Sequence, residues 1–162
     1  MTTLSHLDAE GRARMVDVSG KPETARRATA EGTIILSPAA CEGIRAHAGP
    51  KGEVLATAEL AGVMGAKRTA ELIPLCHPIG LEHVEVRAML DDTLPGVRVR
   101  ATARAMGRTG VEMEALTAAA VALLTVYDMV KAAGPEFRIG DIVLVEKSGG
   151  KHGDWKRSET DG

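Results

Sequence analysis

The stretch TGVEMEALTAAAVALLTVYDMVKAAGP (residues 109–135) carries the strongest secondary-structure signal in the chain. Thr109 is followed three residues later by Glu112, a spacing typical of a capping box, in which both side chains satisfy free backbone amides at a helix start. Gly134 and Pro135 are typical of a helix end. The pattern therefore predicts one long helix.

The segments around this helix alternate apolar and polar residues, as strands do. Residues 81–90 and 96–106 alternate with period two across the turn DDTLP, which predicts a hairpin. Residues 137–147 predict a last strand, and residues 24–36 predict a first one.

Two helices are expected between the first strand and the hairpin. Residues 37–49 form a helical unit that Ser37 can cap and Gly49 ends. Residues 51–72 have apolar residues at helical spacing, with a face of small residues.

The order of elements predicts an α+β fold, a ferredoxin-like β-α-β-β-α-β sandwich with one extra helix. The helices would cover one face of a four-stranded antiparallel sheet. We expect a single domain over residues 23–147, a mobile N-terminal arm over 1–22 and a flexible Gly-rich tail over 148–162.

The composition is that of a globular chain of 162 residues, 44% hydrophobic and 26% charged. A formal net charge of −2 argues against a nucleic-acid partner. No apolar run approaches the ~20 residues of a membrane span. The N-terminus lacks the apolar core of a signal peptide, so we expect a cytoplasmic location.

The heptapeptide LIPLCHP (residues 72–78) places a cysteine beside a histidine between two prolines. Adjacent side chains rarely bind one ion, and the paired ligands of a structural zinc site are missing, so we expect no metal site. Catalytic Cys–His pairs meet through the fold instead of along the chain. Spacing alone therefore predicts a stiff loop that leaves a helix.

Several charged residues are candidates for binding or catalysis. Glu112 and Glu114 lie in the first turn of the long helix, and Asp128 and Lys131 lie in its last turns. Capping and the helix dipole explain all but Asp128, which opposes the dipole unless Lys131 offsets it. The lysines and glycines of EKSGGKHGDWK (146–156) suit an anion, although a disordered tail is the simpler interpretation.

Four separated phrases together resemble one family. They are MVDVSGKPETARRATAEG, KGEVLATAELAGVMGAKRTAELIPLCHP, GRTGVEMEALTAAAVALLTVYDMVKA and KSGGKHGDW, in this order. The chain resembles the cyclic pyranopterin monophosphate synthase family, the C protein of molybdenum cofactor biosynthesis, from about Leu4 to Trp155.

The resemblance implies a lyase-type reaction on 3′,8-cyclo-7,8-dihydro-GTP. The imidazole ring of the purine opens, the pterin forms, a cyclic phosphate closes on the sugar and pyrophosphate leaves. No redox cofactor and no protein-bound cofactor is implied, while magnesium carried by the substrate triphosphate stays open. Proton transfer and phosphate positioning would supply the catalysis.

The resemblance also implies site residues. Lys51 and Lys131 resemble the family's acid–base lysines, Asp128 its active-site acid, and His77 a substrate-contacting or proton-transferring residue. The substrate-binding positions are Leu75, Cys76, His77, Glu112, Met113 and Glu114, with Lys67, Lys147 and Lys151 as triphosphate contacts.

The length of the predicted helix adds an argument about assembly. Glu114 and Asp128 lie fourteen residues apart, or about 21 Å at ~1.5 Å per residue. One nucleotide would not bridge both ends, so we expect a site between subunits. The family resembles a hexamer built as a trimer of dimers, and the small residues of both long helices would suit close packing between subunits.

Two other functions stay open on the sequence. A non-catalytic nucleotide-binding regulatory module would need the anion site but not the Asp128–Lys131 pair. A metal-assisted phosphohydrolase would need a carboxylate cluster for two ions, which the sequence lacks.

Overall fold

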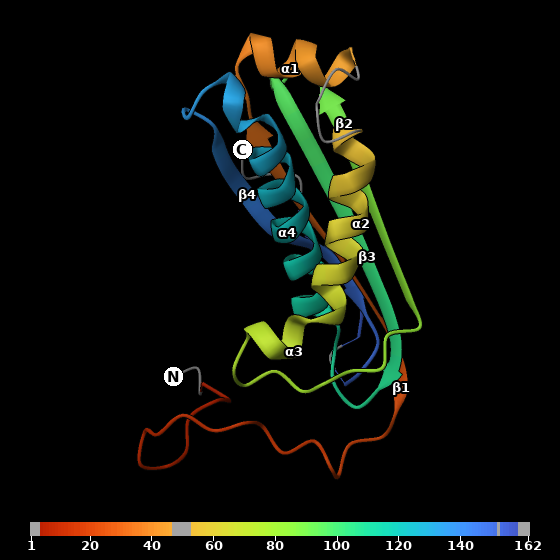
Figure 1. Cartoon of the computed structure of the whole chain (residues 1–162). Helices are drawn as coiled ribbons and strands as arrows, with labels where there is room; N and C mark the ends of the chain where they lie inside the picture. Colours follow the sequence, from red (N-terminus) through yellow and green to blue (C-terminus); the bar gives the residue numbers. More distant parts are fainter. Residues whose placement is uncertain (1–3, 47–52, 152, 159–162) are drawn as a thin grey trace.

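One antiparallel sheet forms the centre of the computed structural model, which describes residues 4–46, 53–151 and 153–158 (Figure 1). The order of its strands is β2-β3-β1-β4-β5. The strands are β1 (Thr24–Ile35), β2 (His83–Asp91), β3 (Gly96–Gly107), β4 (Arg138–Ser148) and β5 (Trp155–Lys156). The helices are α1 (Pro38–Arg45), α2 (Val54–Lys67), α3 (Thr69–Leu72) and α4 (Glu112–Val130), which continues into the 3₁₀ turn η1 (Lys131–Ala133).

The predicted α+β architecture is confirmed. The first four strands follow the order of a ferredoxin-like sheet, in which β1 pairs with β3 and β4 and the β2–β3 hairpin completes one edge. The expected count of four strands was one too few, because the tail supplies β5. This short strand pairs Trp155 with Lys147 and Lys156 with Glu146 on the outer edge of β4.

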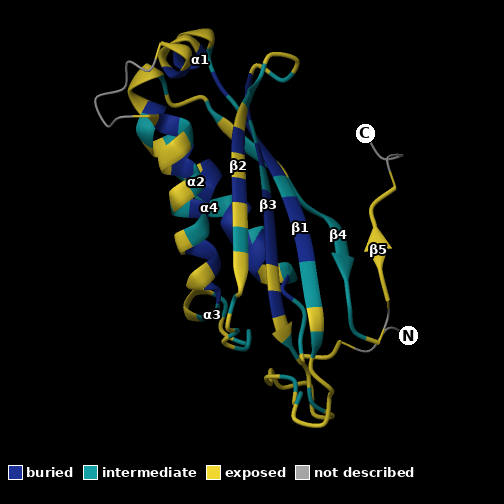
Figure 2. Ribbon diagram, turned by 90° about the vertical axis from the view of Figure 1, so that its right-hand side faces the viewer, coloured by how far each residue is buried: buried dark blue, intermediate teal, exposed yellow. Residues whose placement is uncertain are grey.

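The helices α2 and α4 cover one face of the sheet (Figures 1 and 2). Small residues fill the layer between them, since alanines and valines of β1 and β3 are fully buried there. The two helices pack so closely that a Cβ on Gly62 would lie 2.9 Å from the carbonyl oxygen of Ala118. A Cβ on Gly65 would lie 2.8 Å from the Val121 side chain.

This packing corrects one expectation about the small-residue face of α2. Ala58, Gly62, Gly65 and Ala66 are buried within a single chain, against α4 and the sheet. They are therefore not available for contact between subunits. The segment 112–133 is apolar and long enough to cross a membrane, but one side of α4, including Ala118, Ala122 and Leu123, is buried in this core.

The long helix begins and ends at different residues than predicted. α4 starts at Glu112 instead of Thr109, and no side chain caps it. Lys131 lies in η1, just beyond the last residue of α4. The helix expected over 51–72 breaks at Arg68 into α2 and α3, and the Thr69 hydroxyl donates to the carbonyl of Ala66 at 2.9 Å.

The opposite face of the sheet carries no helix within the described residues (Figure 2), and polar side chains of β1, β3 and β4 bond to one another across it. Thr29 is fully buried there and shares a hydrogen bond of 2.9 Å with Thr102. The Glu146 carboxylate accepts from Arg27 and from the Thr29 hydroxyl, and the Arg27 hydrogen bond lowers the pKa of Glu146. Cross-strand ion pairs therefore cover this face in place of a second layer.

Candidate active site

The LIPLCHP loop runs past the first turn of α4. After α3 ends at Leu72, residues 73–78 have no regular structure. A cavity of about 120 Å³ lies between this loop and the helix. We name it the carboxyl cavity, and its lining includes Leu75, Cys76, His77, Glu112, Met113 and Glu114. Six of the predicted site residues are thus brought together from two segments far apart in the sequence.

Glu114 is the buried acid of this cavity. It is only 3% exposed, and burial raises the pKa of its carboxyl, with the negative charge of Glu112 adding to the effect. Burial also raises the pKa of the Cys76 thiol, and Glu114 raises it further. The cavity therefore favours neutral acids, which can donate hydrogen bonds or protons to a ligand.

A second cavity, of about 390 Å³, adjoins the first and is rich in cations. We name it the cation cavity. Two of its lysines, Lys147 and Lys151, were predicted from the sequence. Lys21, Arg26 and Arg108 line it as well, with Ser5, Thr109, Gly110, Glu112, Gly149 and Gly153.

Two glycines with positive φ, Gly149 and Gly150, follow the end of β4 beside the cation cavity. Gly149 has φ +92°, and a Cβ there would lie 2.1 Å from the carbonyl oxygen of Ala25. A Cβ on Gly150, at φ +82°, would lie 1.9 Å from the guanidinium of Arg26. At Gly149 only glycine fits, because the close atom belongs to the backbone, and at Gly150 the positive φ favours glycine.

Glu112 belongs to both cavities. Its Oε1 accepts from Lys147 Nζ at 3.1 Å, while Thr109 and Gly110 also line both cavities. A third cavity, of about 420 Å³, contains His77, Arg108 and Thr109 and adjoins the other two. The three hollows form one continuous region at the N-terminal end of α4, where the helix dipole adds positive potential.

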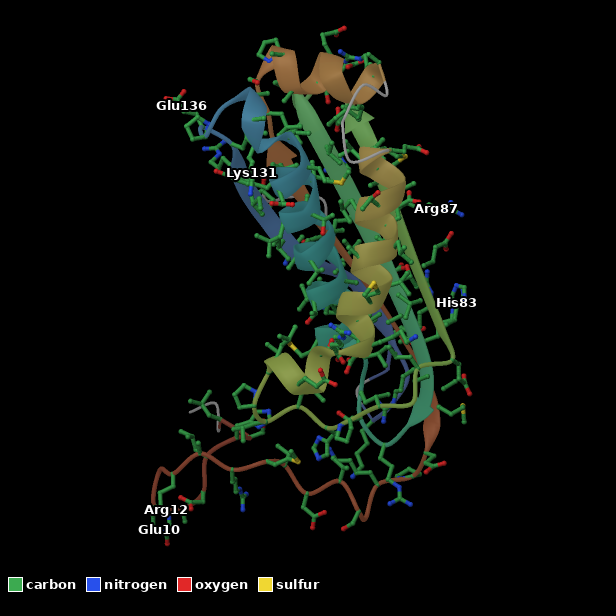
Figure 3. All side chains as sticks on the ribbon, viewed as in Figure 1. Glu10, Arg12, His83, Arg87, Lys131 and Glu136 are labelled. Atoms are coloured by element: carbon green, nitrogen blue, oxygen red, sulfur yellow. The ribbon has the colours of Figure 1, made fainter. Side chains whose placement is uncertain are left out.

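Lys131 lies at the opposite end of α4 (Figure 3), and Asp128 lies in the last turn of the same helix. Their side chains pair with each other, Lys131 Nζ to Asp128 Oδ1 at 2.7 Å, and both are more than half exposed. The hydrogen bond and the charge of Asp128 raise the pKa of Lys131. In one chain this pair is about 20 Å from Glu114, from ~1.5 Å per residue of helix.

Two further predicted residues lie outside these cavities. Lys67 is exposed at the end of α2 and lines none of the three. Lys51 falls outside the described residues.

Comparison with known proteins identifies the family. The model of the MoaC family matches residues 15–150. The chain belongs to the MoaC family.

Relatives of this MoaC-family chain match nearly its whole length. A protein of Methylobacterium sp. (strain 4-46) is 57% identical over 155 residues, covering 96% of this chain and 97% of the relative. Proteins of Brucella ovis and Roseiflexus sp. (strain RS-1) are each 55% identical and cover 96% of this chain, and 94% and 98% of themselves. All three are named cyclic pyranopterin monophosphate synthase.

Sequence reasoning missed several cavity-lining residues of this MoaC-family chain. Lys21 and Arg108 have no local motif, and Arg26, beside Arg27, is a basic candidate that is unremarkable by itself, so only the fold gathers the three. His6 lines the carboxyl cavity from the N-terminal arm, without any local motif to mark it. Among residues 4–46, 53–151 and 153–158, no three His, Cys, Asp or Glu side chains are grouped to hold a metal ion.

Proposed function

We propose that this MoaC-family enzyme is a cyclic pyranopterin monophosphate synthase in molybdenum cofactor biosynthesis. In this proposal it converts 3′,8-cyclo-7,8-dihydro-GTP to cyclic pyranopterin monophosphate and releases pyrophosphate. The observation that carries the proposal is the 55–57% identity, over 96% of the chain, to proteins of that name. The pairing of a cation cavity with a carboxyl cavity fits a substrate that has both a triphosphate and a purine-derived ring.

The two cavities would bind different parts of the substrate. Lys147, Lys151 and Arg26 would hold the triphosphate, because several cations can share its charge. The carboxyl cavity would then receive the ring system, with His77 and Glu114 close to the atoms that exchange protons.

Asp128 and Lys131 would join this site from a second subunit, and Lys51 is proposed to act with them. Within one chain, the helix length separates Asp128 and Lys131 from the cavities. Leu60, Met64 and Leu124 are about half exposed or more on the outer sides of α2 and α4, which supports association of copies. We propose a hexamer, a trimer of dimers, with sites between subunits.

The proposal needs no protein-bound cofactor, and magnesium would arrive with the triphosphate. No nucleic-acid or membrane partner is part of it, and the reaction is placed in the cytoplasm. The substrate is a small nucleotide derivative whose charge the cation cavity suits.

Incubation with 3′,8-cyclo-7,8-dihydro-GTP tests the activity directly. Mass spectrometry should detect the cyclic pterin product, and a coupled assay should detect one pyrophosphate per turnover. Folded, oligomeric protein that yields neither product would refute the proposal.

A further inference from the structure

The N-terminal arm forms one wall of the candidate site. Ser5 and Lys21 line the cation cavity, Val18 lines the third cavity, and His6 lines the carboxyl cavity. The arm crosses below the end of α4 that carries these cavities (Figures 1 and 3). His6 is therefore a second histidine in the hollow that already contains His77.

The arm holds His6 through a closed turn. Arg14 N donates to His6 O at 2.9 Å, and the His6 ring pairs through Nδ1 with Arg14 O at 3.3 Å. Inside the turn, Asp8 accepts from the backbone amides of Glu10 and Arg12 at 3.0 and 2.8 Å. The hydrogen bonds from Arg12 and Glu10 lower the pKa of Asp8, which keeps it ionised as an acceptor.

These contacts select one tautomer of the neutral His6 ring. A backbone carbonyl only accepts hydrogen bonds, so Nδ1 must carry the proton that it donates to Arg14 O. The lone pair of the neutral ring is then on Nε2, which no group of the described chain bonds. A histidine in this state is a base at Nε2.

We propose that His6 is a further catalytic residue, a general base that acts on the substrate in the carboxyl cavity. This inference rests on the proposed function. Nε2 takes a proton from an N–H or O–H group of the bound substrate, the electron pair stays on the substrate atom, and the ring becomes an imidazolium. The titratable side chains of the same cavity are Cys76, His77, Glu112 and Glu114. The Glu112 carboxylate, which is ion-paired with Lys147, would stabilise that cation.

Two substitutions distinguish a role of His6 as a general base from a role in holding the N-terminal arm. In His6→Asn the amide nitrogen takes the position of Nδ1 and keeps the donor to Arg14 O, but the base is lost. In His6→Gln the amide lies near the position of Nε2, and the donor to the arm is lost as well. The matched control is His83→Gln, because His83 is an exposed histidine of β2 away from the carboxyl cavity (Figure 3).

Steady-state kinetics and a pH–rate profile on the cyclised substrate provide the test. A general base contributes about 10²–10⁴-fold, so kcat should fall by that factor in both His6 variants. The KM of both variants should stay within a few fold of the wild-type value. The decrease in rate at low pH that protonation of this base causes should disappear from the pH–rate profile. The His83→Gln variant should match the wild type in kcat, KM and pH–rate profile.

Other results overturn the role of His6. Full activity in His6→Asn with loss in His6→Gln would mean that His6 only supports the arm. Unchanged kcat in both variants, or a change in KM alone, would also exclude a base. Wild-type protein that forms no product overturns the proposed function itself, whereas an active wild type with active His6 variants overturns this inference alone.

Discussion

At the scale of single residues, the Glu112–Lys147 pair is the contact that joins the two cavities. Its 3.1 Å separation keeps the lysine directed toward the hollow that Arg26 and Arg108 also line. An arriving phosphate would compete with Glu112 for Lys147. The pair therefore positions the cation before the ligand binds, at some cost in affinity.

Replacing Lys147 by Ala should weaken substrate binding. The loss of one charge-assisted hydrogen bond is worth roughly 1.5–3 kcal/mol, so KM should rise about ten- to hundredfold, with a smaller effect on kcat. Lys156→Ala is the matched control, since Lys156 lies on β5 and does not line the cation cavity. Equal KM values for the two variants would place the phosphates elsewhere.

Replacing Glu114 by Gln tests the buried acid through stability. Burial raises the pKa of Glu114 in the folded state, so folding takes up a proton once the pH exceeds the unfolded pKa. Wild-type stability is therefore highest below that pKa and falls as the pH rises toward the folded pKa. The Glu114→Gln variant lacks this loss, so its stability relative to wild type should grow as the pH rises above about 4, the ordinary pKa of a glutamate.

Urea unfolding of both proteins over this pH range measures the difference. Glu112→Gln is the control, because the Glu112 side chain is more exposed and bonded to Lys147. A stability difference between the wild type and the Glu114→Gln variant that stays constant with pH would contradict a raised pKa for Glu114.

At the scale of elements, the α2–α4 contact fixes the position of the first turn of α4. Glycine lets the two helix backbones approach at Gly62, where a side chain has no room beside the Ala118 carbonyl and Val86. Since α3 and the LIPLCHP loop continue from the end of α2, this contact also sets where the loop meets α4. Close helix packing thus precedes, along the chain, the loop that lines the carboxyl cavity.

Gly62→Ala should destabilise the protein although alanine favours helices. Overpacking costs about 1–3 kcal/mol, and the gain in helix propensity offsets about 1 kcal/mol. Gly43→Ala on α1 is the matched control, because a Cβ there meets nothing within 4 Å and should stabilise by about 0.4–1 kcal/mol. Chemical unfolding compares them, and equal stability of the two variants would contradict the close contact.

The elements were largely predictable from the sequence, because each has its own periodicity and punctuation. The start of α4 was not predicted correctly. The Glu112 side chain makes a tertiary contact in place of the expected capping box with Thr109. The Glu112 carboxylate folds over Gly110 and pairs with Lys147, which is 35 residues away. Local pattern carries no information about such a partner.

The site was less predictable than the fold. Spacing gave LIPLCHP only as a stiff loop, and the family resemblance alone pointed to Leu75, Cys76 and His77. The meeting of this loop with the first turn of α4 depends on packing between distant segments. Residues without a local motif, such as Lys21 and His6, gain significance only when the fold places them beside a cavity.

At the scale of the whole molecule, one chain holds two separate groups of polar residues. The cavities lie at one end of α4 and the Asp128–Lys131 pair at the other. A dimer with twofold symmetry would place each group beside its complement and create two equal sites. Assembly would then be a condition for activity as well as a source of stability.

Mixing two inactive variants tests shared sites. Lys131→Ala and His77→Ala should each bind substrate and fail to turn over. Random reassociation gives half heterodimers with one intact site of two, so about a quarter of the wild-type activity should return. Mixed oligomers without any recovery would place all catalytic groups within one chain, and full activity of Lys131→Ala alone would favour a non-catalytic role for the Asp128–Lys131 pair.

The β5 strand also affects how copies of the chain can meet. Its pairing with β4, together with the hydrogen bonds from Arg157 to Val145 O at 2.7 Å and Leu144 O at 3.0 Å, occupies the outer edge of the sheet near Ser148. At the other edge, Glu59 of α2 accepts from the Ala88 amide at 2.9 Å. A second chain can add a strand at these points only by displacing the chain's own groups. The same tail that borders the cation cavity thus hinders edge-to-edge addition of strands from other chains, which would lead to fibres.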